Sequence, residues 1–208
     1  AATAHDMELF QAMHSGQPQA KNYLKGGNGH GARIAGYGTM TITTLMALLS
    51  WELSEDCGVK IKDFNRDIAY DCIHTNTNES GYMGYRFATG AYSPVGLQGL
   101  SIIVHRVANR PGTEDYVNRV TRGLEKSKTR INDGHGDNSL AWGWALLGIQ
   151  LSGNDAATRE VFDYNKAFIN ITAGPEPMPT RSLPNLPAAV PCVRSARAWA
   201  SNTSCRAR

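Results

Sequence analysis

Three stretches of this chain are apolar on nearly every face, and they constrain the fold more than any other feature. They cover residues 39–54, 93–109 and 138–152, and each follows a loop rich in glycine. A helix without a polar face has to be buried on all sides. We therefore expect these stretches to form the three most buried helices and to lie side by side.

The third apolar stretch shows the pattern most clearly. Just before it, His135 lies between two glycines, and Asp137 and Asn138 follow at the helix start. Either of these two side chains can accept the free backbone N–H groups of a first helical turn. The other two apolar stretches also follow loops that contain glycine and tyrosine.

Half-polar helices are predicted between the apolar ones. They cover residues 4–14 and the segments that begin at Asp63, Thr113 and Asp155. The connection from an apolar to a half-polar helix is short, whereas the connection back is long and glycine-rich. Units repeated about 45–55 residues apart predict stacked helical hairpins, with an inner apolar layer and an outer half-polar layer. All the long loops would then lie at one rim, where function is usually found on such scaffolds.

The composition limits the organisation and the partners of the chain. Its 208 residues are 41% hydrophobic with a net charge of +3, which fits a globular domain and gives no reason to expect nucleic acid. No apolar run reaches the length of about 18 residues that a membrane helix needs. We expect an all-α domain over residues 1–173 and an extended or disordered Pro-rich tail, containing arginine, over 174–208. A start at Ala1, without a basic and apolar leader, suits a processed mature chain or an excised fragment.

The cysteines leave the disulfide pattern open. They fall as Cys57 with Cys72 and Cys192 with Cys205, without the short spacing of a zinc site. Two disulfides are permitted and neither is required. No phosphate loop, dinucleotide fingerprint or serine-nucleophile motif is present, so no cofactor is expected.

The loop motifs resemble those of a known scaffold. Glycine and tyrosine at 36–38 and 81–84, and the segment 134–148, are similar to the hairpin units of α/α-toroids, which terpenoid cyclases, protein prenyltransferases and several polysaccharide lyases share. The likeness covers residues 26–170 and points to an uncharacterised family of exported bacterial proteins. The acidic motif of the cyclases and the zinc set of the prenyltransferases are absent. About seven helices are predicted, so the resemblance implies a partial toroid, completed by the rest of a longer chain or by a second copy.

The same resemblance suggests a polysaccharide lyase that acts on an acidic glycan at the rim. A lyase needs a base, and a group that neutralises the carboxylate next to the proton it removes. The predicted catalytic residues are His135, Tyr85, Arg86 and Asn138, and the predicted substrate-binding residues are His30, Tyr37, Tyr82 and Asp137. The alternative is a non-catalytic scaffold that binds a glycan or a protein, in which the glycines make turns and the polar residues cap helices.

Two further interpretations concern the histidines. A metal site from His30, His135 and Asp137 is chemically allowed, but nothing in the spacing enforces it, so no metal is predicted. His74 and His105 fall on helices and are interpreted as packing or surface residues. A polysaccharide substrate implies a secreted or periplasmic protein, without a nucleic-acid or membrane partner.

Overall fold

The computed structural model describes residues 26–29, 39–59, 66–85, 94–131 and 138–172. Within them the chain is helical, and the β-type pairing is a single isolated bridge between Thr77 and Met83. The elements are α2 (Thr41–Asp56), α3 (Arg66–Thr75), α4 (Val95–Ala108), α5 (Glu114–Lys126), the 3₁₀ turn η2 (Lys128–Arg130), α6 (Asn138–Leu151) and α7 (Asp155–Thr172). The predicted helical class is confirmed for these residues, whereas the helix expected at 4–14 and the tail at 174–208 lie outside them.

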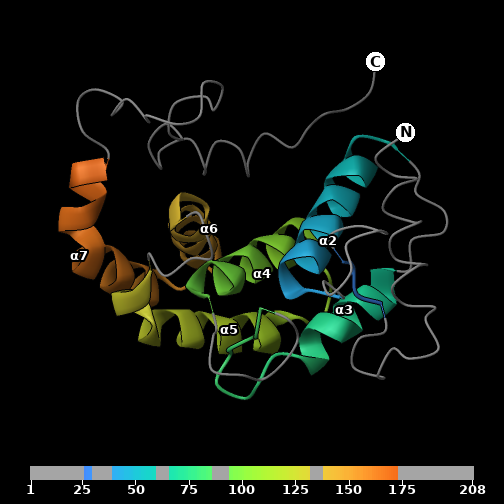
Figure 1. The fold of residues 1–208 in the computed structure, drawn as a ribbon, viewed down its shortest axis with the longest axis horizontal. Coiled ribbons are helices and arrows are strands. Elements are labelled where there is room, and N and C mark those ends of the chain that lie inside the picture. The colour runs from blue at the N-terminus through green and yellow to red at the C-terminus, as the bar shows by residue number, and fades with distance from the viewer. Residues whose placement is uncertain (1–25, 30–38, 60–65, 86–93, 132–137, 173–208) are drawn as a thin grey trace.

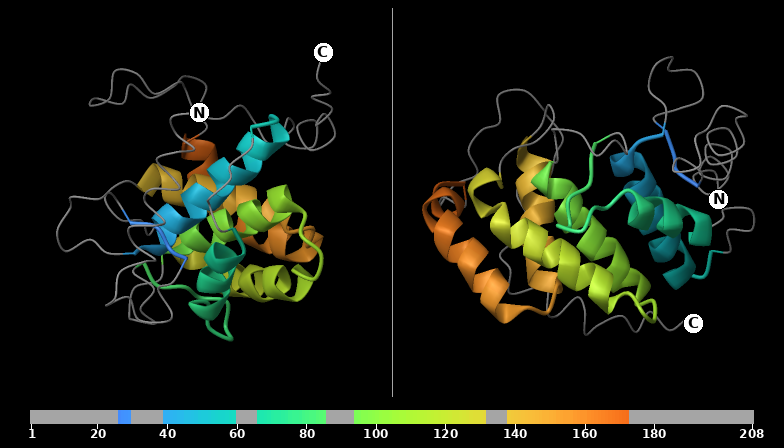
Figure 2. Two further views of the ribbon diagram at one scale, coloured as in Figure 1. Left: turned by 90° about the vertical axis from the view of Figure 1, so that its right-hand side faces the viewer. Right: turned by 90° about the horizontal axis from the view of Figure 1, so that it is seen from below.

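Helix α4 is the central element of the fold. It packs against α2 on one side and α6 on the other, and α5 also contacts it (Figure 1). Helix α3 packs on α2, and α7 packs on both α6 and α5. Seen from below in Figure 2, α3, α5 and α7 lie towards the viewer. The three apolar stretches therefore form neighbouring helices, as the sequence predicts, with half-polar helices packed against them.

Two glycines bring α4 and α6 into close contact. A Cβ atom on Gly96 would lie 2.6 Å from the Cα atom of Ala141, and one on Gly99 would lie 2.1 Å from the carbonyl oxygen of Trp144. A step of three residues along α4, from Gly96 to Gly99, matches a step of three residues along α6, from Ala141 to Trp144. The two helices therefore run parallel, in the same direction, and their N-terminal ends are level. Glycine weakens a helix interior, and at positions 96 and 99 it permits this close approach.

The burial of α2 and α6 is lower than the sequence predicts. Every residue of α4 from Val95 to His105 is buried. By contrast, Met46 of α2 is 48% exposed and Leu147 of α6 is 38% exposed. Since α4 lies between them, α2 and α6 are the end members of the row in the described part of the chain. An apolar sequence shows that a face can be buried, but not that a neighbour covers it.

The ends of α4 also differ from the prediction. The predicted stretch begins at residue 93, but Pro94 takes the cap position in an extended conformation, and the helix begins at Val95. At the other end the helix stops at Ala108, two residues before Arg110. Asn109 adopts the left-handed conformation there, with φ of 46°. Asparagine is one of the few residues other than glycine that tolerate this geometry, so it ends the helix before the Pro-Gly pair.

Candidate functional site

Most of the predicted rim residues lie outside the described part of the chain. His30, Tyr37, Arg86, His135 and Asp137 belong to this group. Asn138 is the first residue of α6, and the structure describes its backbone alone. Tyr82 and Tyr85 are both described and both half-buried.

The segment from Gly81 to Tyr85 joins the beginnings of α2 and α4. The side chain of Gln98, in the first turns of α4, donates from Nε2 to the carbonyl oxygen of Gly81 over 3.1 Å. The backbone N–H of Thr41, the first residue of α2, donates to the carbonyl oxygen of Tyr85 over 3.1 Å. The Thr41 hydroxyl donates to the carbonyl oxygen of Gly84. One short segment thus satisfies a free N–H at the start of α2 and fixes it beside α4.

A second glycine-rich segment meets the same helix end. The carbonyl oxygen of Asn28 accepts from the backbone N–H of Met40 over 2.9 Å, and the Asn28 N–H donates to the hydroxyl of Thr44 over 2.8 Å. Since α4 and α6 run parallel with level N-terminal ends, the beginnings of α2, α4 and α6 lie at one edge of the molecule. We call this edge, with residues 26–29 and 81–85, the rim edge.

The turn before Tyr82 is held by side-chain hydrogen bonds. The side-chain oxygen of Asn78 accepts from the backbone N–H groups of Ser80 and Tyr82, over 3.0 and 2.9 Å. Tyr85 packs against the hydrophobic core. These contacts bring Tyr82 and Tyr85 to the rim edge on a well-hydrogen-bonded segment.

A second group of polar residues lies between the helix layers, where the sequence predicted packing or surface histidines. We call it the buried polar cluster: it consists of His74, Thr77, Ser101, His105 and Tyr116. Nε2 of His74 lies 2.8 Å from Nε2 of His105. Nδ1 of His105 lies 2.7 Å from the carbonyl oxygen of Ser101, which can only accept, so His105 carries its proton on Nδ1. Nε2 of His105 therefore accepts, and His74 donates.

The two imidazole rings lie end to end. Their centroids are 5.1 Å apart and their planes differ by 19°. The centroid separation exceeds the distance between the two Nε2 atoms by about two ring radii, so the rings are nearly collinear. This is the geometry of a linear N–H···N hydrogen bond, and it leaves no space for a metal ion between the two nitrogens.

Tyr116 of α5 covers this imidazole pair. Its ring centroid lies 4.2 Å from that of His74 and 4.4 Å from that of His105. Its hydroxyl forms hydrogen bonds with the hydroxyls of Ser101 and Thr77, over 2.9 and 3.0 Å. The cluster thus joins α3, α4 and α5 through side chains that are all hydrogen-bonded.

Burial favours the neutral form of both imidazoles. His105 is 1% exposed, and burial lowers its pKa to about 3, against the smaller opposing effect of the Ser101 carbonyl. Burial also lowers the pKa of His74, and Asp71 on the same helix works against that shift. A charged imidazole at His105 would lose its hydration without gaining a counter-charge.

A buried carboxyl group adjoins the cluster through Tyr70, whose ring meets that of His105 edge to face. The Tyr70 hydroxyl donates to Oε1 of Glu52 over 2.9 Å. Burial raises the pKa of the Glu52 carboxyl, while the Tyr70 hydrogen bond and Arg66, 3.6 Å away, oppose that rise. Arg110 stacks over the Tyr70 ring at 4.2 Å. The polar contacts therefore continue from α5 through α3 to α2.

A signal for this cluster was present in the sequence. Gln98, Ser101 and His105 recur at intervals of three and four residues along the otherwise apolar α4, so they share one face. All three make hydrogen bonds on the side that faces the Gly81 segment, α5 and α3. A polar stripe on a fully buried helix predicts matching polar groups on its neighbours, because buried polar groups need partners.

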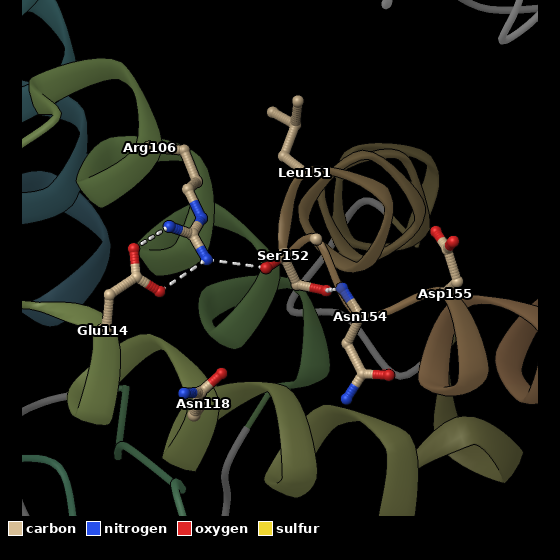
Figure 3. A pocket seen from close by; sticks show the side chains of 8 residues that line it. Arg106, Glu114, Asn118, Leu151, Ser152, Asn154 and Asp155 are labelled. Atoms are coloured by element: carbon tan, nitrogen blue, oxygen red, sulfur yellow. Dashed lines mark hydrogen bonds and ion pairs between the residues drawn. The ribbon is translucent and has the colours of Figure 1, made fainter.

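The described residues also form an open depression of about 800 Å³ at the opposite ends of α4 and α6 (Figure 3). Arg106 lines one side of it and donates from Nη2 to Glu114 over 3.1 Å and to the carbonyl oxygen of Ser152 over 2.6 Å. The Asn154 side chain accepts from the N–H of Ala157 and caps α7. The polar groups in the depression thus serve helix ends, and we assign them a structural role.

Three further findings bear on the class of site. Within the described ranges, no helix is long and apolar enough to span a bilayer. In the same ranges, no three histidine, cysteine, aspartate or glutamate residues lie together as metal ligands would. Comparisons of the chain with protein-family models, with curated proteins and with solved structures give no match.

Proposed function

We propose that this chain is a partial α/α-toroid-like domain that acts as a lyase on an acidic polysaccharide at its rim edge. The observation that carries the proposal is the hydrogen-bonded junction of residues 26–29 and 81–85 at the start of α2, beside the start of α4. It brings two glycine-rich segments and two tyrosines to one edge. In the sequence, His135 precedes the first residue of α6 by three positions.

The chemistry assigns one role to each group. A uronate lyase removes the proton next to the carboxylate and expels the sugar oxygen on the neighbouring carbon, which leaves a double bond. His135 or Tyr85 would serve as the base, and Arg86 and Asn138 would neutralise the carboxylate as negative charge develops. His30, Tyr37, Tyr82 and Asp137 would bind the neighbouring sugars. Because such polymers occur outside the cytoplasm, we propose a secreted or periplasmic protein of an exported bacterial family.

The test is lyase activity on uronate polymers, followed by the ultraviolet absorbance of the unsaturated product. His135→Ala and Tyr85→Phe should each lower the rate by about 10² if the side chain transfers a proton. Tyr85→Phe keeps the backbone carbonyl that caps α2, so its fold should be unchanged. Tyr164→Phe, on the 56% exposed Tyr164 of α7, is the matched control and should retain full activity.

A second candidate is a non-catalytic scaffold that binds a glycan or a protein. The hydrogen bonds of the Gly81–Tyr85 segment favour it, because they hold the start of α2 in the way expected of residues that form turns and caps. Binding of a uronate polymer without turnover would support this candidate and refute the lyase. Failure to bind any uronate polymer would refute the glycan part of both proposals.

A further inference from the structure

Helix α3 connects the buried polar cluster to the rim edge. His74 lies in its last turn and bonds to His105 of α4. The chain then runs directly from α3 to the Gly81–Tyr85 segment, whose last carbonyl accepts from the N–H of Thr41. A loss of the contact between α3 and α4 would therefore also disturb the start of α2.

The hydrogen bonding of the imidazole pair limits how many protons it can hold. A proton added to His74 goes to Nδ1 and leaves the bond to His105 in place. Nδ1 of His105 already donates to the Ser101 carbonyl, so a proton added to His105 has to go to Nε2. Two N–H groups would then face each other at 2.8 Å. The docked pair can thus accept one proton, whereas two separated imidazoles accept two.

The surrounding charges oppose even the first proton. Burial has the largest effect on the pKa of His74 and lowers it. Asp71 of α3 raises this pKa, while Arg110 and Arg119 lower it further. Burial also has the largest effect on the pKa of His105, and His74, Arg110 and Arg106 lower that pKa further. Tyr70 and Tyr116 pack against the pair as neutral phenols, because burial raises the pKa of both hydroxyls. The docked pair therefore takes up a proton less readily than free histidine does.

We propose that the His74–His105 pair is a pH-sensitive latch, in which proton uptake below neutral pH releases α3 and, with it, the Gly81–Tyr85 segment from the start of α2. The bond between the two Nε2 atoms closes the latch, and two hydrated imidazolium groups stabilise the open state. The link to α2 is the Tyr85 carbonyl, which leaves the Thr41 N–H when the segment moves.

The expected size of the pH effect on latch opening follows from proton linkage. Each proton bound only in the open state raises the ratio of open to closed molecules by about tenfold per pH unit below about 6.5. Two such protons give about a hundredfold per pH unit. If His74 takes its proton while docked, the effect falls to about tenfold.

Amide hydrogen exchange of the full chain, followed by mass spectrometry, tests the latch without any glycan. After correction for intrinsic exchange rates, protection of α3 should fall by about tenfold to a hundredfold per pH unit between about pH 6.5 and about pH 5. Protection of the first turn of α2 should fall in parallel, and α6 serves as the internal reference. Equal pH dependence of α3 and α6 would overturn the latch, and loss of protection in α3 alone would overturn its link to the rim edge.

Two variants sharpen the test. His74→Gln keeps an N–H donor for His105 but cannot take up a proton, so it should remove up to a factor of about ten per pH unit from the exchange of α3. Asp163→Asn, an exposed carboxylate of α7, is the matched control and should leave that exchange unchanged. If His74→Gln unfolds, a titration of the wild-type imidazoles by NMR decides instead. A His105 ring that titrates like free histidine in the folded chain would refute the proposal.

Discussion

Replacement of Gly99 by alanine tests the contact between α4 and α6 most directly. The new Cβ atom would lie 2.1 Å from the Trp144 carbonyl oxygen and 2.6 Å from the Cα atom of Ala145. Both are backbone atoms, so no side chain can turn away, and α6 has to retreat by more than an ångström. Such overpacking costs about 1–3 kcal/mol or more. The better helix propensity of alanine returns about 0.5–1 kcal/mol, so the net result is destabilisation.

Gly143→Ala is the matched control on the facing helix. It also replaces a glycine inside a helix, but nothing lies within 4 Å of its Cβ position. Its expected effect is therefore the propensity gain alone, about 0.5–1 kcal/mol of added stability. In thermal unfolding, each kcal/mol shifts Tm by about 2–4 °C for a domain of this size. Gly99→Ala should lower Tm while Gly143→Ala raises it. Shifts of the same sign would refute the close packing of α4 on α6.

Four further outcomes can be measured by chemical or thermal unfolding. Tyr116→Phe should cost about 1–3 kcal/mol, because the buried Ser101 hydroxyl loses its Tyr116 partner and the Thr77 hydroxyl keeps only its bond to the Ile73 carbonyl oxygen; an unchanged stability would refute the hydrogen bonding of the cluster. Asn154→Ala should cost about 1 kcal/mol through loss of the α7 cap, and an equal effect of the control Asn154→Ser would argue against capping. Asn109→Gly should be nearly neutral, whereas Asn109→Val should destabilise the chain, because the left-handed conformation excludes a β-branched residue. Finally, the depressed pKa of His105 gives a contribution to stability that is complete above about pH 6.5 and is lost towards about pH 3. The loss is about 1.4 kcal/mol per pH unit. Urea midpoints that do not fall over this range would contradict it.

The helices themselves could be predicted from local pattern. A helix-length stretch of mostly apolar and small residues after a glycine-rich loop leaves few alternatives to a buried helix, and α2, α4 and α6 follow this pattern closely. The glycines at 96 and 99 were also interpretable, because glycine weakens a helix unless a neighbour needs the space. The exposure of Met46 and Leu147 was not predictable, since it depends on which helix lies next to the end members of the row.

The buried polar cluster shows a different limit of sequence reasoning. His74 and His105 are separated by 31 positions and occupy different helices. Their contact depends on how α3 crosses α4 and on the rotation of each helix about its axis. The polar stripe on α4 indicates that partners exist, but the partners on α3 and α5 cannot be identified until the packing is known.

The two faces of α4 explain how its position is fixed. On the side of α6, Gly96 and Gly99 permit backbone contact, which fixes the distance between the helices and, through two glycines in register, their relative height. On the side of α3 and α5, Ser101 and His105 bond to partners that a shift of one residue would lose. Apolar packing tolerates small shifts, whereas a buried polar group that loses its partner costs about 1–3 kcal/mol. The polar face therefore selects one register among several that the apolar surface alone would permit. Because α3 leads directly into the Gly81–Tyr85 segment, that register also determines where Tyr82 and Tyr85 meet the start of α2.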